Sequence, residues 1–180
     1  MHQAEKERIA AAALQELPAE GAILLDAGTT TAHLAEHLPA GRDLTVITNS
    51  LSIGLALAGR PRITVLTLGG RVRGRTFAAV DVWALRALEQ TFVDVAFLGT
   101  NGISVQRGLT TPDPAEAEVK RMMIAQARRS VVLADHSKFE SDHLIRFGEL
   151  SDVELVITDD GLEPSIAEGI RASGPRVVLA

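Results

Sequence analysis

Cysteine is absent from the 180 residues of this chain, which excludes disulfide bonds, thiolate metal sites and a cysteine nucleophile together. Tyrosine is also absent and aromatic residues make up only 3%, so few rings are available for stacking nucleic-acid bases. No apolar run approaches the roughly 20 residues of a membrane-spanning helix, and the opening MHQAEKERIA lacks the apolar segment of a secretory signal. We therefore expect a cytoplasmic protein that does not contact a membrane.

The composition is that of a soluble globular protein, with 46% hydrophobic and 23% charged residues. A chain of 180 residues can bury a sizeable core without disulfide or metal support, so we expect one domain over residues 1–180. We expect no metal and no cofactor. The formal net charge of -5 makes the chain as a whole a poor nucleic-acid binder.

Short apolar, β-branched runs alternate with helical stretches along the sequence. The runs are continuously apolar, which is typical of strands that helices bury on both faces. The predicted strands are residues 22–26, 44–48, 63–68, 93–98, 130–134, 155–158 and 176–179. The predicted helices are residues 5–17, 30–38, 51–58, 81–90, 115–128 and 164–172. This alternation predicts an α/β fold with an open, mostly parallel, Rossmann-like sheet and helices on both faces.

Two connections are too rich in glycine and arginine to be simple turns. One is GGRVRGRT at residues 69–76, and the other is GTNGISVQRGLTTPDP at residues 99–114, which is long enough for a small inserted hairpin. Long ordered loops in compact α/β domains tend to carry function. The charged, alanine-rich helix within residues 1–20 is either an amphipathic covering helix or part of a linker to a lost domain.

The first predicted strand ends in Asp26 and is followed by Gly28 and three threonines, Thr29, Thr30 and Thr31. Ligands of open α/β sheets bind at the carboxyl ends of the strands. A helix that begins there offers free N–H groups and the positive end of its dipole to an anion. One hydroxyl would suffice to cap the helix. Because three follow a glycine, we favour a phosphate-binding turn over a simple cap.

The second and third strands also end in polar or glycine residues. These residues are Thr48, Asn49 and Ser50 after the second strand, and Gly69, Gly70 and Arg71 after the third. Taken alone, the first group is an ordinary helix start. The second opens a stretch with Arg71, Arg73 and Arg75 and no acidic residue between Asp43 and Asp81. These arginines either bind an anion or a partner, or belong to a solvated loop.

The fourth and fifth strands end in further candidates for ligand contacts. Gly99 and Gly102 permit close approach of the backbone, and Asn101 between them can both donate and accept hydrogen bonds. Lys138 follows the fifth strand and adds a cation at the same edge of the sheet.

Glu116 and Lys120 lie four residues apart on a predicted helix and therefore share one of its faces. A surface ion pair is the ordinary interpretation of such a spacing. The alternative is that both side chains contact the hydroxyls and phosphate of a ligand. In that case Lys120→Ala should weaken ligand binding without unfolding the domain, because the change removes a charge rather than core volume.

Seven blocks occur along the chain in one order and cover about residues 5–160: LLDAGTTT, VITNS, LGGRVR, VDVAFLGTNGIS, GLTTPDPAEAEVKRMM, VVLADHSKF and LVITDD. In this order they resemble the C-terminal effector domain of DeoR-family bacterial transcription regulators. The resemblance implies a fold like that of ribose-5-phosphate isomerase and CoA transferases. It also implies a sensor that binds a phosphorylated sugar or related metabolite and so alters repression of a sugar-utilisation operon.

The resemblance and the strand-end argument together give one set of candidate ligand-binding residues. The set is Asp26, Gly28, Thr29, Thr30, Thr31, Thr48, Asn49, Ser50, Gly69, Gly70, Arg71, Gly99, Asn101, Gly102, Glu116, Lys120 and Lys138. Family members carry an N-terminal winged helix-turn-helix, so operator DNA is expected as a partner only through such a domain ahead of Met1. The resemblance also implies a homo-oligomer. From their apolar character we interpret Phe77, Val80, Val82 and Trp83 as a partly exposed contact surface, although burial of Trp83 is an equal alternative.

An isomerase-type enzyme of the same fold is the alternative function. Isomerisation requires a carboxylate base near the carbon-bound proton. The related isomerases have Asp-Gly-Ala-Asp-Glu after the fourth strand, whereas residues 98–102 here read LGTNG and contain no carboxylate. We therefore expect a sensor without catalytic residues. A dinucleotide-binding enzyme is disfavoured because the chain has no G-x-G-x-x-G motif.

Overall fold

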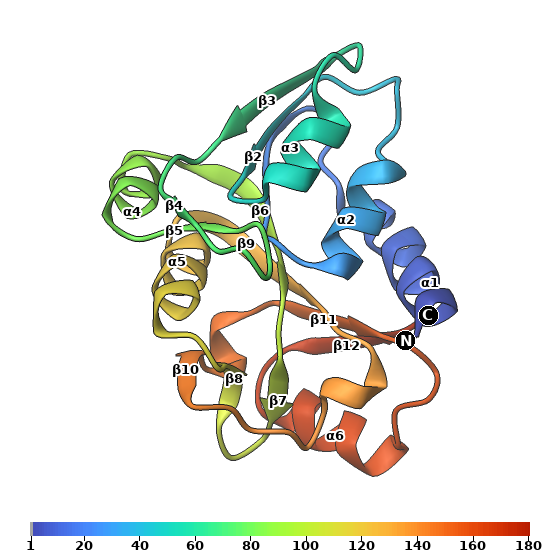
Figure 1. Cartoon of the computed structure of the whole chain (residues 1–180). Helices are drawn as coiled ribbons and strands as arrows, with labels where there is room; N and C mark the ends of the chain where they lie inside the picture. Colours follow the sequence, from blue (N-terminus) through green and yellow to red (C-terminus); the bar gives the residue numbers. More distant parts are fainter. Residues whose placement is uncertain (1) are drawn as a thin grey trace.

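The computed structural model describes residues 2–180 and is built around one large parallel sheet (Figure 1). Seven strands lie in the order β12-β11-β9-β6-β1-β2-β3, and all neighbours are parallel. Their bounds are β1 (Gly21–Leu25), β2 (Leu44–Thr48), β3 (Ile63–Thr67), β6 (Val93–Gly99), β9 (Ala127–Leu133), β11 (Leu155–Thr158) and β12 (Arg176–Leu179). The chain order reverses between β1 and β6, which is where such sheets open a crevice. The predicted open, mostly parallel sheet is confirmed.

Helices cover both faces of the sheet, as predicted. The helices are α1 (Gln3–Ala13), α2 (Thr29–Glu36), α3 (Leu51–Leu57), α4 (Val82–Glu89), α5 (Pro114–Ala125) and α6 (Pro164–Ala172). Side chains alternate along each buried strand, so Ile23 and Leu25 pack beneath α1, α2 and α3, whereas Leu24 packs on the opposite face with α4, α5 and α6. Within residues 2–180, no helix is long and apolar enough to cross a membrane.

Two small sheets are inserted into the connections that we singled out. The predicted hairpin within residues 99–114 is confirmed as β7 (Gly102–Ser104) and β8 (Gly108–Thr111), to which β10 (Ile145–Gly148) adds a third antiparallel strand. The connection at residues 69–76 leads into a second hairpin, β4 (Arg71–Val72) with β5 (Ala79–Val80). Both insertions follow strands of the large sheet at its carboxyl edge (Figure 1).

Three expectations about the elements need correction. Helix α5 ends at Ala125, and residues 127–128 belong to β9 rather than to the predicted helix, because β9 pairs with β6 from Ala127 onward and Arg129 bonds to Glu16 and Glu154. Helix α1 ends at Ala13, and the short 3-10 helix η1 (Leu14–Glu16) follows it. Trp83 is not buried: it is 71% exposed at the start of α4. Two further 3-10 helices are η2 (His136–Lys138) and η3 (Leu150–Asp152).

Candidate functional site

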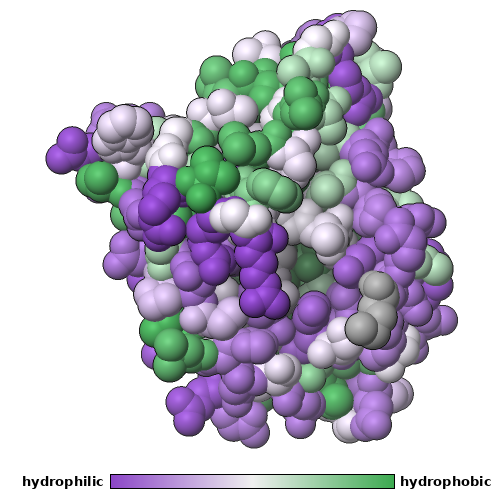
Figure 2. All heavy atoms as spheres, in the orientation of Figure 1, coloured by the Kyte–Doolittle hydropathy of each residue, from purple (hydrophilic) through white to green (hydrophobic). Residues whose placement is uncertain are grey.

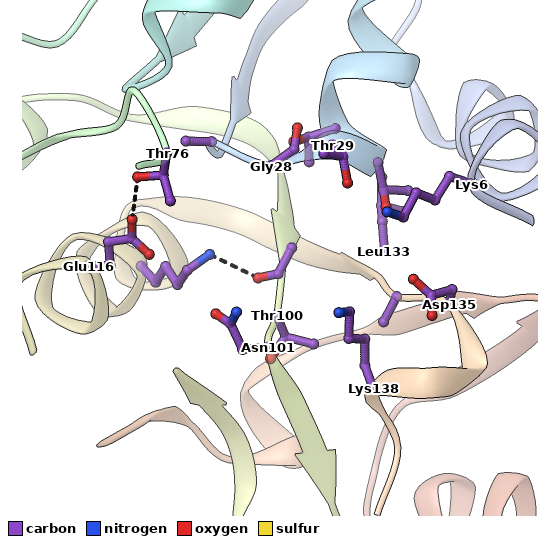
Figure 3. Close-up of a pocket in the computed structure, with 16 residues that line it drawn as sticks. Lys6, Gly28, Thr29, Thr76, Thr100, Asn101, Glu116, Leu133, Asp135 and Lys138 are labelled. Carbon is purple, nitrogen blue, oxygen red and sulfur yellow. Dashed lines mark hydrogen bonds between the residues drawn. The ribbon is translucent and has the colours of Figure 1, made fainter. Parts of the chain in front are cut away.

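A pocket opens at the carboxyl ends of β1, β6 and β9, beside the point where the strand order reverses (Figure 3). Its volume is about 180 Å³, and Figure 2 shows the surface hollowed there with hydrophilic residues around the opening. The lining residues are Lys6, Ala27, Gly28, Thr29, Thr30, Thr31, Thr76, Gly99, Thr100, Asn101, Glu116, Lys120, Leu133, Ala134, Asp135 and Lys138. Nine of the candidate residues therefore come together in one place.

Helix α2 points its N-terminus at this pocket without a side-chain cap. Gly28 is the N-cap residue, and no side chain bonds to the first turn, so the alternative of a simple threonine cap does not hold. Thr31 Oγ1 instead lies 2.6 Å from the carbonyl oxygen of Asp26, which holds the turn against the end of β1. The free N–H groups and the helix dipole make this end attractive to an anion.

The pocket contains all three lysines of the chain: Lys6 from α1, Lys120 from α5 and Lys138 from η2. Figure 3 shows the side chains of Lys6 and Lys138 directed into the pocket. Within residues 2–180, neither of these two ammonium groups forms an ion pair. These two ammonium groups and the end of α2 outweigh the carboxylate of Asp135, which lies on the same wall (Figure 3), so this wall attracts an anion.

Asp26 and Lys120 form a buried ion pair beneath the pocket, with side chains only 2% and 5% exposed. Lys120 Nζ also donates to the carbonyl oxygen of Gly99 at 2.9 Å, and the Gly99 N–H donates to Asp26 Oδ2 at 3.1 Å. Burial raises the pKa of the Asp26 carboxyl, against the opposing effect of Lys120. Of the two interpretations of Glu116 and Lys120, a surface ion pair between them is wrong, because Lys120 instead bonds to Asp26 and to the Gly99 carbonyl and so connects α5 to β1 and β6.

Glu116 is held from the β4–β5 hairpin. Its Oε1 accepts hydrogen bonds from Arg73 Nη1 at 2.5 Å and from Thr76 Oγ1 at 2.8 Å. Arg73 Nη2 also lies 3.2 Å from Oδ2 of Asp113, the residue that caps α5 by accepting from the Glu116 N–H. Of the two interpretations of Arg73, neither a free anion ligand nor a solvated loop residue fits, since its guanidinium bridges two carboxylates.

The polar residues Thr48, Asn49 and Ser50, at the end of β2 and directly after it, support the pocket and do not line it. Thr48 Oγ1 donates to the carbonyl oxygen of Leu25 at 2.7 Å, and Asn49 Oδ1 accepts from the Ala27 N–H at 2.9 Å. Ser50 caps α3 by accepting from a backbone N–H of its first turn. These contacts fix the end of β1 and thereby the turn that leads to α2.

Four other candidates also lie outside the lining, and three of them have structural roles. Gly70 has a φ of 142° and a Cβ there would lie 2.3 Å from the Val80 carbonyl oxygen, so a glycine is needed just before β4, where the chain passes the end of β5. Arg71 pairs with Asp81 at 2.7 Å on the outer side of the hairpin. The close approach predicted for Gly102 is to the backbone of Ser141. The fourth is Gly69, beside which the structure has open space.

Seven lining residues were not among the candidates: Lys6, Ala27, Thr76, Thr100, Leu133, Ala134 and Asp135. Most of them are immediate neighbours of candidates at strand ends. Lys6 is different, because only the packing of α1 beside α2 brings it to the pocket. One signal could have found it: the chain contains three lysines among 18 basic residues, so each lysine is an exceptional choice over arginine.

Residues 1–160 match the family model described as the DeoR C-terminal sensor domain. The chain belongs to this family. This sensor domain is 37% identical over 173 residues to the HTH-type transcriptional regulator GlpR of Haloferax volcanii, a match that covers 96% of the chain and 68% of that protein. The chain spans about two thirds of the length of the curated relatives it matches. The resemblance to DeoR-family regulators is confirmed.

Solved structures share the fold of this DeoR-type sensor domain. Ribose 5-phosphate isomerase A from Methanocaldococcus jannaschii matches with a TM-score of 0.56 and 18% identity over 77% of this chain and 55% of that one. The probable sor operon regulator from Shigella flexneri matches with a TM-score of 0.60 and 12% identity over 93% and 88% of the two chains. At such identities the likeness shows the fold alone, and the predicted fold relationship to the isomerase is confirmed.

Proposed function

We propose that this sensor domain binds a phosphorylated sugar in the pocket at the ends of β1, β6 and β9. The observation that carries the proposal is the meeting of an uncapped helix N-terminus with two unpaired ammonium groups, Lys6 and Lys138. A phosphate there would accept hydrogen bonds from the first turn of α2 and be balanced by both lysines. Positive groups gathered in this way in an acidic chain support an anionic ligand.

The opposite wall of the pocket supports a polyhydroxyl group rather than an apolar one. Thr76, Thr100, Asn101 and Glu116 offer hydroxyl, amide and carboxylate groups, which can exchange hydrogen bonds with sugar hydroxyls. A volume of about 180 Å³ lies below the roughly 300–1,000 Å³ of pockets for drug-sized ligands. We therefore propose a single small sugar phosphate rather than a nucleotide.

We further propose that the domain regulates transcription as part of a repressor of sugar metabolism. Bound sugar phosphate would shift the regulator between two arrangements, which requires different affinities for the two. Operator DNA would be a partner through a helix-turn-helix domain, since this chain has a net charge of -5. A second copy of the chain is also a proposed partner, with the exposed Phe77, Val82 and Trp83 as contacts, whereas Val80 is buried.

The second candidate function is a sugar-phosphate isomerase, favoured by the shared fold with ribose 5-phosphate isomerase A. The chemistry needs a carboxylate that is free to take a proton from carbon. The turn at residues 99–102 has none. Each of the two carboxylates in the lining has one oxygen bound within the chain: Glu116 Oε1 by Arg73 and Thr76, and Asp135 Oδ1 by the N–H and hydroxyl of Ser137. We therefore propose a receptor rather than an enzyme.

A thermal-shift screen of the chain against sugar monophosphates tests the proposal, because a ligand that binds the folded state raises the melting temperature. We expect a rise with at least one sugar monophosphate and none with its unphosphorylated parent. Lys6→Gln with Lys138→Gln should abolish the rise. The matched control, Arg86→Gln with Arg107→Gln, removes the same charge from exposed positions outside the pocket and should preserve it.

An equal rise with the lysine variant and with its control would contradict the proposed phosphate site. A coupled assay for aldose–ketose isomerisation of the ligand found in the screen decides between the two functions. Turnover at about 1–1,000 per second would favour the enzyme, whereas binding without turnover supports the sensor.

A further inference from the structure

The Glu116 carboxylate belongs to two parts of the molecule at once. It lines the pocket, and its Oε1 is bound by Arg73 and Thr76 of the segment between β4 and β5 (Figure 3). Within residues 2–180, Oε2 of Glu116 takes part in no hydrogen bond. One oxygen is therefore fixed by the hairpin, while the other remains available to a donor in the pocket.

The contact between Arg73 and α5 is not an ordinary surface ion pair. The side chains of Arg73 and Glu116 are only 21% and 12% exposed, and the guanidinium also reaches the Asp113 carboxylate. Planar guanidinium groups that bridge two acceptors fix the orientation of both. Arg73 thus determines which way the Glu116 carboxylate faces, although Arg73 itself does not line the pocket.

We propose that the β4–β5 hairpin is part of the ligand sensor: Arg73 positions Glu116 to accept a sugar hydroxyl, and ligand binding fastens the hairpin to α5. This rests on the proposed function. Thr76 supplies a direct contact from the hairpin to the ligand, and Glu116 supplies an indirect one through Arg73. Coupling between two contacts is reciprocal. The free energy by which the hairpin contact strengthens ligand binding therefore equals the free energy by which bound ligand stabilises the contact between the hairpin and α5.

The charges of the pocket also fix the orientation of the ligand. Lys6, Lys138 and the N-terminus of α2 attract the phosphate to one wall, and the negative Glu116 disfavours it at the other. The hydroxyl end of the sugar is then the part that meets the hairpin. Inorganic phosphate fills only the first wall, so it should bind without affecting the hairpin.

The β4–β5 hairpin also contacts α3 at the surface of the domain, outside the pocket. Phe77 lies at its tip, is half exposed, and accepts a hydrogen bond from the Leu51 N–H at the start of α3 at 3.1 Å. A change in how firmly Arg73 and Thr76 hold α5 would therefore alter the surface around Phe77 and α3. A sugar hydroxyl that bonds to Glu116 in the pocket would in this way change the position or mobility of Phe77 at the surface.

The first arm of the test measures the hairpin contact without ligand. Trypsin cleavage after the exposed Arg75 is followed by mass spectrometry in the wild type, Glu116→Gln and Arg71→Ala. Arg71→Ala is the matched control, because Arg71 is on the same hairpin and pairs with Asp81 away from the pocket. We expect cleavage to accelerate by about tenfold or more in Glu116→Gln and to stay unchanged in the control. Equal rates in all three would overturn the proposal.

The second arm measures affinity by calorimetry with inorganic phosphate and with a panel of sugar monophosphates. Arg73→Ala should lower the affinity for sugar monophosphates by about tenfold or more and leave the affinity for inorganic phosphate unchanged. Arg73→Lys should keep part of the affinity for sugar monophosphates that Arg73→Ala loses. Equal affinity of the wild type and Arg73→Ala for every sugar monophosphate that binds would overturn the hairpin's role alone. If no sugar monophosphate binds the wild type, the proposed function fails and the coupling fails with it.

Discussion

Among single residues, Asp26 and Lys120 link the floor of the pocket to the core. Lys120→Ala would leave the Asp26 carboxylate buried without its partner, so we expect the free energy of unfolding to fall by about 3–5 kcal/mol. The sequence predicts that Lys120→Ala leaves the stability of the domain unchanged, whereas the buried ion pair predicts a large loss of stability. Urea denaturation measures the loss. The loss should shrink at lower pH. Burial raises the pKa of Asp26, and without Lys120 to lower it, the carboxyl in the folded variant takes up a proton at a higher pH than in the unfolded chain.

The matched variant is Asp26→Asn with Lys120→Met, which removes both charges and roughly preserves side-chain volume. We expect this double variant to be more stable than Lys120→Ala, because no unpaired charge remains in the core. If the double variant loses as much stability as Lys120→Ala, the cost comes from packing and not from the unpaired carboxylate.

Asp159 gives the domain an acid-sensitive contact. Burial would raise its pKa, but hydrogen bonds from the N–H and ring of His136 and from the Gly161 N–H outweigh it, so the pKa is lowered from 3.8. The resulting stability is present above 3.8 and is lost as pH falls through the lower folded value. In Asp159→Asn, the urea midpoint should fall less steeply with acidification below that pH. An unchanged slope would contradict this assignment.

At the scale of elements, the β4–β5 hairpin depends on one glycine. Gly70 has a positive φ of 142°, and an added Cβ would lie 2.3 Å from the carbonyl oxygen of Val80. We expect Gly70→Ala to lower the free energy of unfolding by about 1–3 kcal/mol, measured by chemical denaturation. Gly69→Ala is the control, because nothing lies near that position. Equal effects of the two substitutions would place the strain elsewhere.

The seven strands of the large sheet could be predicted from the sequence because each is a continuous apolar run between helices. β4, β5 and β10 could not, since two to four residues carry no usable periodicity. The sequence predicts a helix through Arg128, because the polar residues at the start of β9 lack the apolar pattern of a buried strand. Pairing with β6 and the contacts of Arg129 with Glu16 and Glu154 override that local pattern.

In the candidate site too, residues at strand ends could be predicted from the sequence, whereas residues that tertiary packing brings to the pocket could not. Gly28, Asn101 and Lys138 could be predicted because residues after parallel strands gather at one edge of the sheet. Lys6 could not be placed by that rule, since it enters from a helix whose packing the sequence does not specify. Lys120 lines the pocket together with the other candidates, but its buried pairing with Asp26 depends on the contact of α5 with β1 and β6.

On the scale of the whole molecule, two elements that pack together at one edge of the large sheet carry no charge. α3 (LSIGLAL) and the edge strand β3 (ITVLT) contain no ionisable residue, and Leu55 is 81% exposed. Phe77, one of the proposed contacts between copies, adjoins the start of α3 through the hydrogen bond from the Leu51 N–H. A contact that extends from Phe77 over α3 and β3 buries no charge of these two elements, so we expect light scattering to give a mass above the 19.1 kDa of one chain. Leu55→Lys should reduce that mass. A wild-type mass of one chain would contradict the homo-oligomer.

The central claim is that the pocket recognises the phosphate of a sugar phosphate through α2, Lys6 and Lys138. Titration calorimetry with a sugar monophosphate and its unphosphorylated parent tests it most directly. Two lost charge-assisted hydrogen bonds, each worth about 1.5–3 kcal/mol, predict that the parent binds about 100-fold more weakly or worse. Equal affinity for the phosphorylated and unphosphorylated sugar would contradict the account.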